Sequence, residues 1–97
     1  MSRVIFASHG GLSKGMKDSV SMIVGDLAKD VETYSLLPGQ NPEDYYLDLL
    51  KEAKESEEQI VILCDIKGGS VHTALSKLAV LDNVMVFSGM NMGLALD

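Results

Sequence analysis

The pattern of apolar and polar positions predicts four short strands separated by helices. The apolar run at 4–7 stops abruptly at the Ser-His-Gly-Gly stretch 8–11, which indicates a buried strand that ends in a tight loop. The run at 60–64 is apolar without alternation, as expected for a central parallel strand covered by helices on both sides. Runs at 31–35 and 84–87 predict the other two strands.

Apolar residues recur at helical spacing between these strands and predict three helices. The first covers residues 13–29, with Ser13 placed to cap its N-terminus. The second begins after Asn41, a cap residue followed by a proline, and runs to about Ser56. The third contains the apolar positions of the segment 71–78. Each predicted strand except the last is therefore followed by a complete helix.

The order of elements predicts an α/β fold that ends in the start of a fourth helix capped by Asn91. Right-handed crossovers give a parallel sheet with helices on both faces. For a doubly wound, flavodoxin-like sheet of this size the common strand order is 2-1-3-4, which places strands one and three side by side where the ligand crevice opens. His9 follows the first strand and Asp65 follows the third, so we expect the two to meet in that crevice.

The length and composition of the chain limit its number of domains and the kinds of partner that it can bind. The 97 residues predict one domain, residues 1–97, with a single core. There are 14 acidic and 8 basic residues, a net charge of −6 without a basic cluster, which argues against nucleic acid and favours a protein partner. No signal peptide or membrane span is visible, so we expect a cytoplasmic protein. Cys64 is expected to be a buried core residue.

The pairing of His9 with Asp65 indicates nucleophilic chemistry at a histidine. A carboxylate that accepts a hydrogen bond from one ring nitrogen fixes the tautomer and leaves the lone pair of the other nitrogen free to attack. The turn Gly68-Gly69-Ser70 adds backbone N–H groups and a hydroxyl, and Gly10 permits close approach on the other side. These residues predict phosphoryl transfer through a phosphohistidine, with no cofactor and no metal-ligand set visible in the sequence.

Other classes of protein share parts of this pattern. A receiver domain has the same strand order and a phosphate-accepting aspartate after strand three, but it needs an acidic cluster where this chain has the residues 8–10. A flavin-binding module would need an aromatic residue after the candidate loops. A metal chelatase could use His9 and His72, although we expect His72 to be a solvated helix residue. A non-catalytic or regulatory module of the same fold would not need both His9 and Asp65.

Three segments occur in order along the chain. They are Ala7-Ser8-His9-Gly10 with Gly15 and Ser19, then Asp65-Ile66-Lys67-Gly68-Gly69-Ser70, and finally Val86-Phe87-Ser88-Gly89-Met90-Asn91. Together they resemble the signature segments of the mannose-type IIA component of the bacterial phosphoenolpyruvate-dependent sugar phosphotransferase system. The resemblance implies that His9 accepts a phosphoryl group from the phosphocarrier protein HPr and passes it to a IIB component. It also implies that Asp65 is the partner of the His9 ring and that Ser70, with its turn, holds the phosphoryl oxygens.

The resemblance further implies a cytoplasmic homodimer that associates only indirectly with membrane permease subunits. Sugar specificity in such systems belongs to the membrane components, so a IIA domain contacts proteins alone. The chain departs from the family pattern at Val71 and Gly93, where proline is common, and in its length. Family members usually continue through the fourth helix to a strand that often crosses to a dimer partner. We therefore expect a C-terminally truncated chain or different dimer contacts, with the last strand exposed as a sheet edge.

Overall fold

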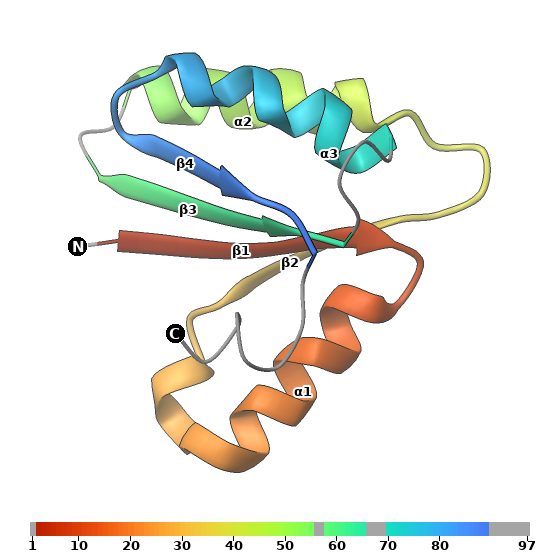
Figure 1. The fold of residues 1–97 in the computed structure, drawn as a ribbon, viewed down its shortest axis with the longest axis vertical. Helices are drawn as coiled ribbons and strands as arrows, with labels where there is room; N and C mark the ends of the chain where they lie inside the picture. The colour runs from red at the N-terminus through yellow and green to blue at the C-terminus, as the bar shows by residue number, and fades with distance from the viewer. Residues whose placement is uncertain (1, 56–57, 66–69, 90–97) are drawn as a thin grey trace.

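The computed structural model describes residues 2–55, 58–65 and 70–89 (Figure 1). Its parallel sheet has the strand order β2-β1-β3-β4, which confirms the predicted α/β fold class and topology. The strands are β1 (Ser2–His9), β2 (Glu32–Leu36), β3 (Gln59–Cys64) and β4 (Val84–Phe87). The helices are α1 (Leu12–Val24), α2 (Pro42–Glu55) and α3 (Ser70–Leu75), and the 3₁₀ segments are η1 (Gly25–Ala28) and η2 (Ser76–Val80).

The sheet is covered on both faces, by α2 and α3 on one side and by α1 on the other (Figure 1). Side chains alternate along a strand, so neighbouring residues of β1 enter different cores. Ile5 packs with Leu49 of α2 and Leu75 of α3, whereas Phe6 packs with Val20 of α1. Both clusters are almost completely removed from solvent. This two-sided burial explains why the strand run at 60–64 is apolar without alternation.

The first helix differs from its prediction at both ends. It begins at Leu12, one residue before Ser13, and the preceding residue Gly11 offers no side chain to cap it. The prediction that Ser13 caps the helix is therefore wrong, because Ser13 lies inside the first turn. At the other end α1 stops at Val24 and continues as η1, since Gly25 leaves the helical conformation with a φ of 62°. Apolar spacing alone does not distinguish a 3₁₀ turn from the last turn of an α-helix.

The second helix follows its prediction closely. The Asn41 side-chain oxygen accepts a hydrogen bond from the backbone N–H of Glu43 at 3.0 Å, as expected for a helix cap. Pro42 is the first helical residue, where its missing N–H costs no hydrogen bond. Leu49 and Ala53 are buried against the sheet, which confirms the apolar face. The predicted fourth helix at Asn91 lies outside the described residues.

Cys64 lies at the end of β3 and is completely buried, which confirms its place in the core. Burial, together with the negative charge of the neighbouring Asp65, raises the pKa of the Cys64 thiol to about 12. Because the thiolate is the reactive form, we expect no modification of the folded protein by an aromatic disulfide reagent at pH 8. The same reagent should titrate one thiol after unfolding in guanidinium chloride. Rapid labelling under native conditions would contradict this placement.

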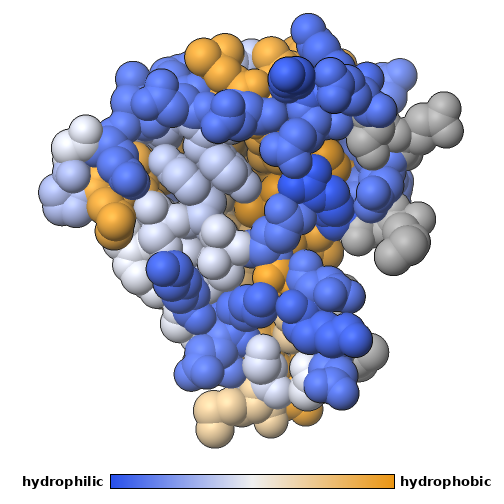
Figure 2. Space-filling model, turned by 180° about the vertical axis from the view of Figure 1, so that it is seen from behind, coloured by the Kyte–Doolittle hydropathy of each residue, from blue (hydrophilic) through white to orange (hydrophobic). Residues whose placement is uncertain are grey.

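Hydrophobic surface on the face seen from behind is divided into several patches by hydrophilic side chains (Figure 2). Among the described residues, large apolar side chains are exposed on α1 at Met22 and Ile23 and on β4 at Met85 and Phe87. Within the same residues, β4 pairs only with β3 and is therefore an outer strand of the sheet. No helix in the described part of the chain is long and apolar enough to cross a membrane.

Candidate active site

The structure brings His9 and Asp65 into direct contact. His9 is the last residue of β1 and Asp65 directly follows β3, and these two strands are neighbours with Ala7 opposite Cys64. The Oδ2 atom of Asp65 accepts a hydrogen bond from the backbone N–H of His9 at 2.8 Å. It also lies 2.8 Å from the ring Nδ1 of His9. One carboxylate oxygen thus holds both the backbone and the ring of the histidine.

These contacts define the tautomer of the His9 ring. A carboxylate can only accept, so we assign the ring proton to Nδ1, which donates to Asp65. The lone pair of the ring is then on Nε2. Ser70, the first residue of α3, lies with its Oγ 2.7 Å from Nε2, and its hydroxyl donates to that lone pair. Nε2 is therefore the ring nitrogen that carries the lone pair, and a hydroxyl group lies next to it.

Burial differs between the two partners in a way that suits nucleophilic chemistry. The His9 side chain is 44% exposed, whereas that of Asp65 is only 8% exposed. The carboxylate charge is therefore poorly screened by water and can stabilise positive charge that develops on the ring during attack. The exposed edge of the ring remains accessible to another molecule.

Gly10 sets the direction in which the chain leaves His9. Its φ is 57°, a left-handed conformation that L-residues with side chains rarely adopt. Its N–H donates to the carbonyl of Leu36 at the end of β2, at 2.8 Å. The loop after β1 is thereby tied to the neighbouring strand.

The remaining sequence candidates are His72 and the turn that contains Ser70. His72 lies in the first turn of α3, as expected, and its side chain is partly buried, so it is less solvated than the prediction of a solvated helix residue implied. Its neighbours Val71 and Ala74 enter the core, which draws this side of the short helix toward the sheet. Gly68 and Gly69 lie outside the described residues. Ser70 is the member of that turn that the structure places against the ring.

A group of buried serine hydroxyls behind the histidine was not predicted. Ser8 Oγ accepts a hydrogen bond from the N–H of Ser13 at 2.7 Å and donates to the carbonyl of Gly10 at 3.2 Å. Ser13 Oγ donates to the carbonyl of Tyr34 at 3.0 Å and lies 3.2 Å from Ser35 Oγ. The available signal was strand alternation, which turns Ser8 to the opposite face from His9 and toward α1.

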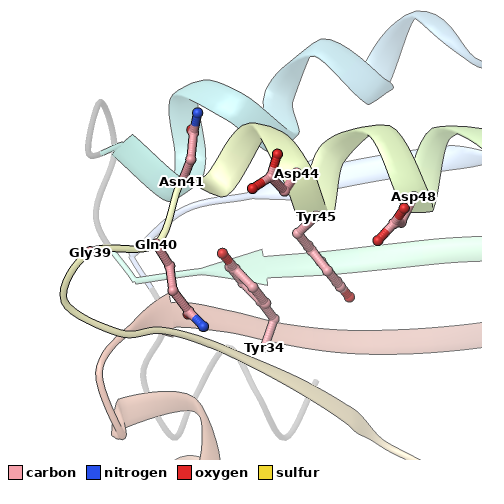
Figure 3. A pocket seen from close by; sticks show the side chains of 7 residues that line it. All are labelled: Tyr34, Gly39, Gln40, Asn41, Asp44, Tyr45 and Asp48. Carbon is pink, nitrogen blue, oxygen red and sulfur yellow. The ribbon is translucent and has the colours of Figure 1, made fainter.

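A separate shallow hollow of about 420 Å³ lies between β2 and the start of α2 (Figure 3). It is lined by Tyr34, Gly39, Gln40, Asn41, Asp44, Tyr45 and Asp48. The rings of Tyr34 and Tyr45 stack with their centroids 4.1 Å apart and nearly parallel planes, which joins the helix to the edge of the sheet. Burial and the nearby charge of Asp44 raise the pKa of the Tyr34 hydroxyl. None of His9, Asp65 and Ser70 lines this hollow.

Metal-ligating side chains do not form a cluster in the part of the chain that the structure describes. No group of three or more His, Cys, Asp or Glu residues there is arranged to hold a metal ion.

Comparisons with known proteins agree on one family. Residues 3–96 match the EIIA-man family, described as the PTS system fructose IIA component. The chain is 34% identical over 99 residues to the sorbose-specific EIIA component of the PTS system of Klebsiella pneumoniae, an alignment that covers all of this chain and 72% of that protein.

Solved structures of similar proteins show the same fold. A PTS IIA protein associated with the fucose utilization operon of Streptococcus pneumoniae has a TM-score of 0.78 and 31% identity, over 99% of this chain and 77% of that one. The mannose/sorbose-specific IIA subunit of Enterococcus faecalis has a TM-score of 0.82 and 26% identity, over 98% of this chain and 73% of that one.

We call His9, Asp65 and Ser70 the His9 cluster. The fold and this cluster define a class, a doubly wound α/β domain that presents a histidine–aspartate pair at the switch point of its sheet. Within that class, the chain belongs to the EIIA-man family and is a IIA component of the sugar phosphotransferase system. Family membership implies a part in phosphoryl transfer during sugar uptake.

Proposed function

We propose that this domain carries a phosphoryl group on Nε2 of His9, which it accepts from HPr and passes to a IIB component. The observation that carries the proposal is the position of the ring between Asp65 Oδ2 at Nδ1 and Ser70 Oγ at Nε2. A ring held in this way presents one nitrogen of defined tautomer at an exposed edge.

The transfer step is a direct displacement at phosphorus. The Nε2 lone pair attacks the phosphorus atom of the donor phosphohistidine, and the P–N bond of the donor breaks with its electron pair returning to the donor ring. Nδ1 keeps its proton, so positive charge develops on the His9 ring beside the Asp65 carboxylate. In the second step the acceptor group of the IIB component attacks the phosphorus atom, and the P–Nε2 bond breaks with its electron pair returning to the His9 ring. Each step breaks one bond to phosphorus and forms another, and neither requires a cofactor.

The neighbouring groups have separate roles. Ser70 donates to the Nε2 lone pair in the resting site, and as the phosphoryl group arrives its hydroxyl turns from that lone pair to donate to a phosphoryl oxygen, which frees Nε2 to attack. We assign the same task to the backbone of Gly68 and Gly69 on the basis of the family resemblance. Gly10 is assigned to close approach of the phosphoryl group, because its own N–H already donates to the Leu36 carbonyl. Asp65 is assigned to orientation and charge, because its nearly buried carboxylate oxygen already accepts from both the backbone and the ring of His9.

Incubation with phosphoenolpyruvate, the first enzyme of the phosphotransferase system and HPr is the direct test. Intact-mass analysis should show one added phosphoryl group, lost on brief acid treatment and retained in base, as expected for a phosphohistidine. The reaction without HPr is the control and should leave the mass unchanged. An unmodified protein in the complete mixture would rule out HPr as donor, and a base-labile product would indicate an acyl phosphate instead.

We further propose that residues 1–97 act as one domain in the cytoplasm and form a homodimer. The net charge of −6 supports docking to a basic or mixed-charge protein surface rather than to nucleic acid. The exposure of Met85 and Phe87 on the outer strand β4 supports coverage of this edge by a second copy. Association with membrane permease subunits would then run through the IIB component.

A further inference from the structure

We infer that Ser8 is a positioning residue for phosphoryl transfer at His9, acting by holding the carbonyl of Gly10 and with it the conformation of the loop that follows the histidine. This inference rests on the proposed function, since it assigns Ser8 a part in the same reaction. Ser8 directly precedes the histidine, and its side chain is completely buried and points to the opposite face of β1 from that of His9.

The backbone on the N-terminal side of the His9 Cα is already held. Its N–H donates to Asp65 Oδ2, the same oxygen that accepts from the ring. The ring and this part of the backbone are therefore fixed to one atom. The direction of the ring also depends on the two peptides that follow. The first, between His9 and Gly10, is held at the Gly10 N–H by Leu36, and the second, between Gly10 and Gly11, is held at the Gly10 carbonyl by Ser8.

Gly10 is the weak point of the site because glycine has access to more backbone conformations than any other residue. Hydrogen bonds on both sides hold its φ at 57°. Its N–H donates to the carbonyl of Leu36, and its own carbonyl accepts from Ser8 Oγ. An added Cβ at this position would meet no atom within 4 Å, so no neighbour packs against this side of the glycine. The two hydrogen bonds are therefore the contacts that we assign to holding its conformation.

Ser8 connects this glycine to the start of α1. Its Oγ accepts from the N–H of Ser13, one of the first-turn donors that lack an intrahelical partner, and the same hydroxyl donates its proton to the Gly10 carbonyl. The acceptor bond at 2.7 Å orients the hydroxyl, so its proton is directed at one carbonyl. Ser8 therefore replaces a conventional N-cap and fixes the histidine loop with the same atom.

Ser13 provides a matched comparison within the same cluster. Its side chain is equally buried, but its hydroxyl donates to the Tyr34 carbonyl and contacts Ser35, joining α1 to β2. Replacing Ser13 with alanine leaves its backbone N–H on Ser8 Oγ. Ser8→Ala and Ser13→Ala thus remove the same chemical group from similar surroundings. Only Ser8→Ala releases the Gly10 carbonyl, while the Gly10 N–H still donates to Leu36.

We expect Ser8→Ala to slow phosphorylation of His9 by about 10- to 100-fold, the effect of misplacing a reacting group by a fraction of an ångström to an ångström. Ser13→Ala should react at close to the wild-type rate. Each variant should lower Tm by at least about 4–8 °C, because each removes a buried hydroxyl that has two hydrogen-bond partners. Stability alone would then not account for the difference in rate.

Phosphoramidate is the phosphoryl donor of choice, because it needs no protein docking surface. The Nε2 lone pair attacks its phosphorus, the P–N bond breaks, and ammonia leaves with the bonding pair. Rates follow from intact mass over time. In parallel, the ¹⁵N chemical shifts of the His9 ring report its tautomer without any phosphorylation, and in Ser8→Ala they should move toward the averaged values of a free imidazole, with Ser13→Ala unchanged.

Different outcomes would overturn the proposed function and the role of Ser8. A wild-type protein that takes no phosphoryl group from phosphoramidate or from HPr would overturn the proposed function, whatever Ser8 does. A reactive wild type with equal rates and equal ring shifts in both variants would overturn the role of Ser8 alone. If Ser8→Ala does not fold, Ser8→Cys keeps the size but has a much weaker donor and acceptor, and it should show the same loss of rate and the same ring-shift change.

Discussion

Replacing His9 with alanine is expected to abolish phosphoryl acceptance while the fold stays intact. The substitution removes the only atom in the His9 cluster assigned as nucleophile, Nε2, and neither Asp65 nor Ser70 can replace it in a stable phosphoramidate bond. The backbone N–H of residue 9 still donates to Asp65 Oδ2, so one of the two hydrogen bonds to that oxygen survives. The expected loss of stability is about 1–3 kcal/mol, as for a hydrogen bond to a charged group.

The measurement is intact mass after incubation with phosphoenolpyruvate, the first phosphotransferase enzyme and HPr, with thermal unfolding as the check on folding. His72→Ala is the matched control, since it removes the other histidine of the chain, two residues beyond Ser70 on α3. This variant should accept one phosphoryl group as the wild type does. If His72→Ala lost the reaction and His9→Ala kept it, the nucleophile would have been assigned to the wrong histidine.

Asp65→Asn is expected to slow the transfer by roughly 10²–10⁴-fold, the range associated with an acid–base partner, without moving the phosphorylated site. The asparagine keeps the shape of the side chain but loses the charge that stabilises the phosphorylated ring. Its amide group can also donate to Nδ1, which would place the ring proton on Nε2 and remove the nucleophilic lone pair. Both effects act on the chemical step.

The control is Asp44→Asn, the same change of charge and shape on the exposed start of α2, which should leave the rate unchanged. Rates are measured by intact mass, and the phosphoryl group is mapped by fragmentation under neutral or basic conditions. It should be found on His9 in both the wild type and Asp65→Asn. A phosphoryl group on Asp65 of the wild type would indicate a receiver-like mechanism and would end the histidine proposal.

The local pattern of the sequence was enough to predict the elements that depend on neighbouring residues. Strand β4 has the predicted bounds, and α2 starts at the predicted cap Asn41, because the side chain of a cap reaches a donor only two residues away. The position of His9 at the end of a strand follows from the glycines after it. To predict that His9 meets Asp65, one further assumption was needed, namely the preferred strand order of small doubly wound sheets.

The start of α1 was mispredicted because its capping group is not local in the usual sense. Ser13 has the right side chain for a cap, but the strand before it ends so close to the helix that Ser8, five residues earlier, reaches the first turn instead. This contact forms because Ser8 is buried and lies on the face of β1 that is turned toward α1. The spacing of apolar residues within the helix segment does not contain this information.

The amino-acid sequence by itself determined the α/β class, the strand-end histidine and the acid that faces it, because strand and helix periods and glycine positions are properties of short segments. The tertiary structure alone decided which ring nitrogen is free. That depends on Asp65 and Ser70, 56 and 61 positions away from His9, which face opposite nitrogens of one ring at 2.8 and 2.7 Å. Such distances are set by the register of β1 on β3 and by the packing of α3 on the sheet, where a shift of one residue would turn these side chains to other faces.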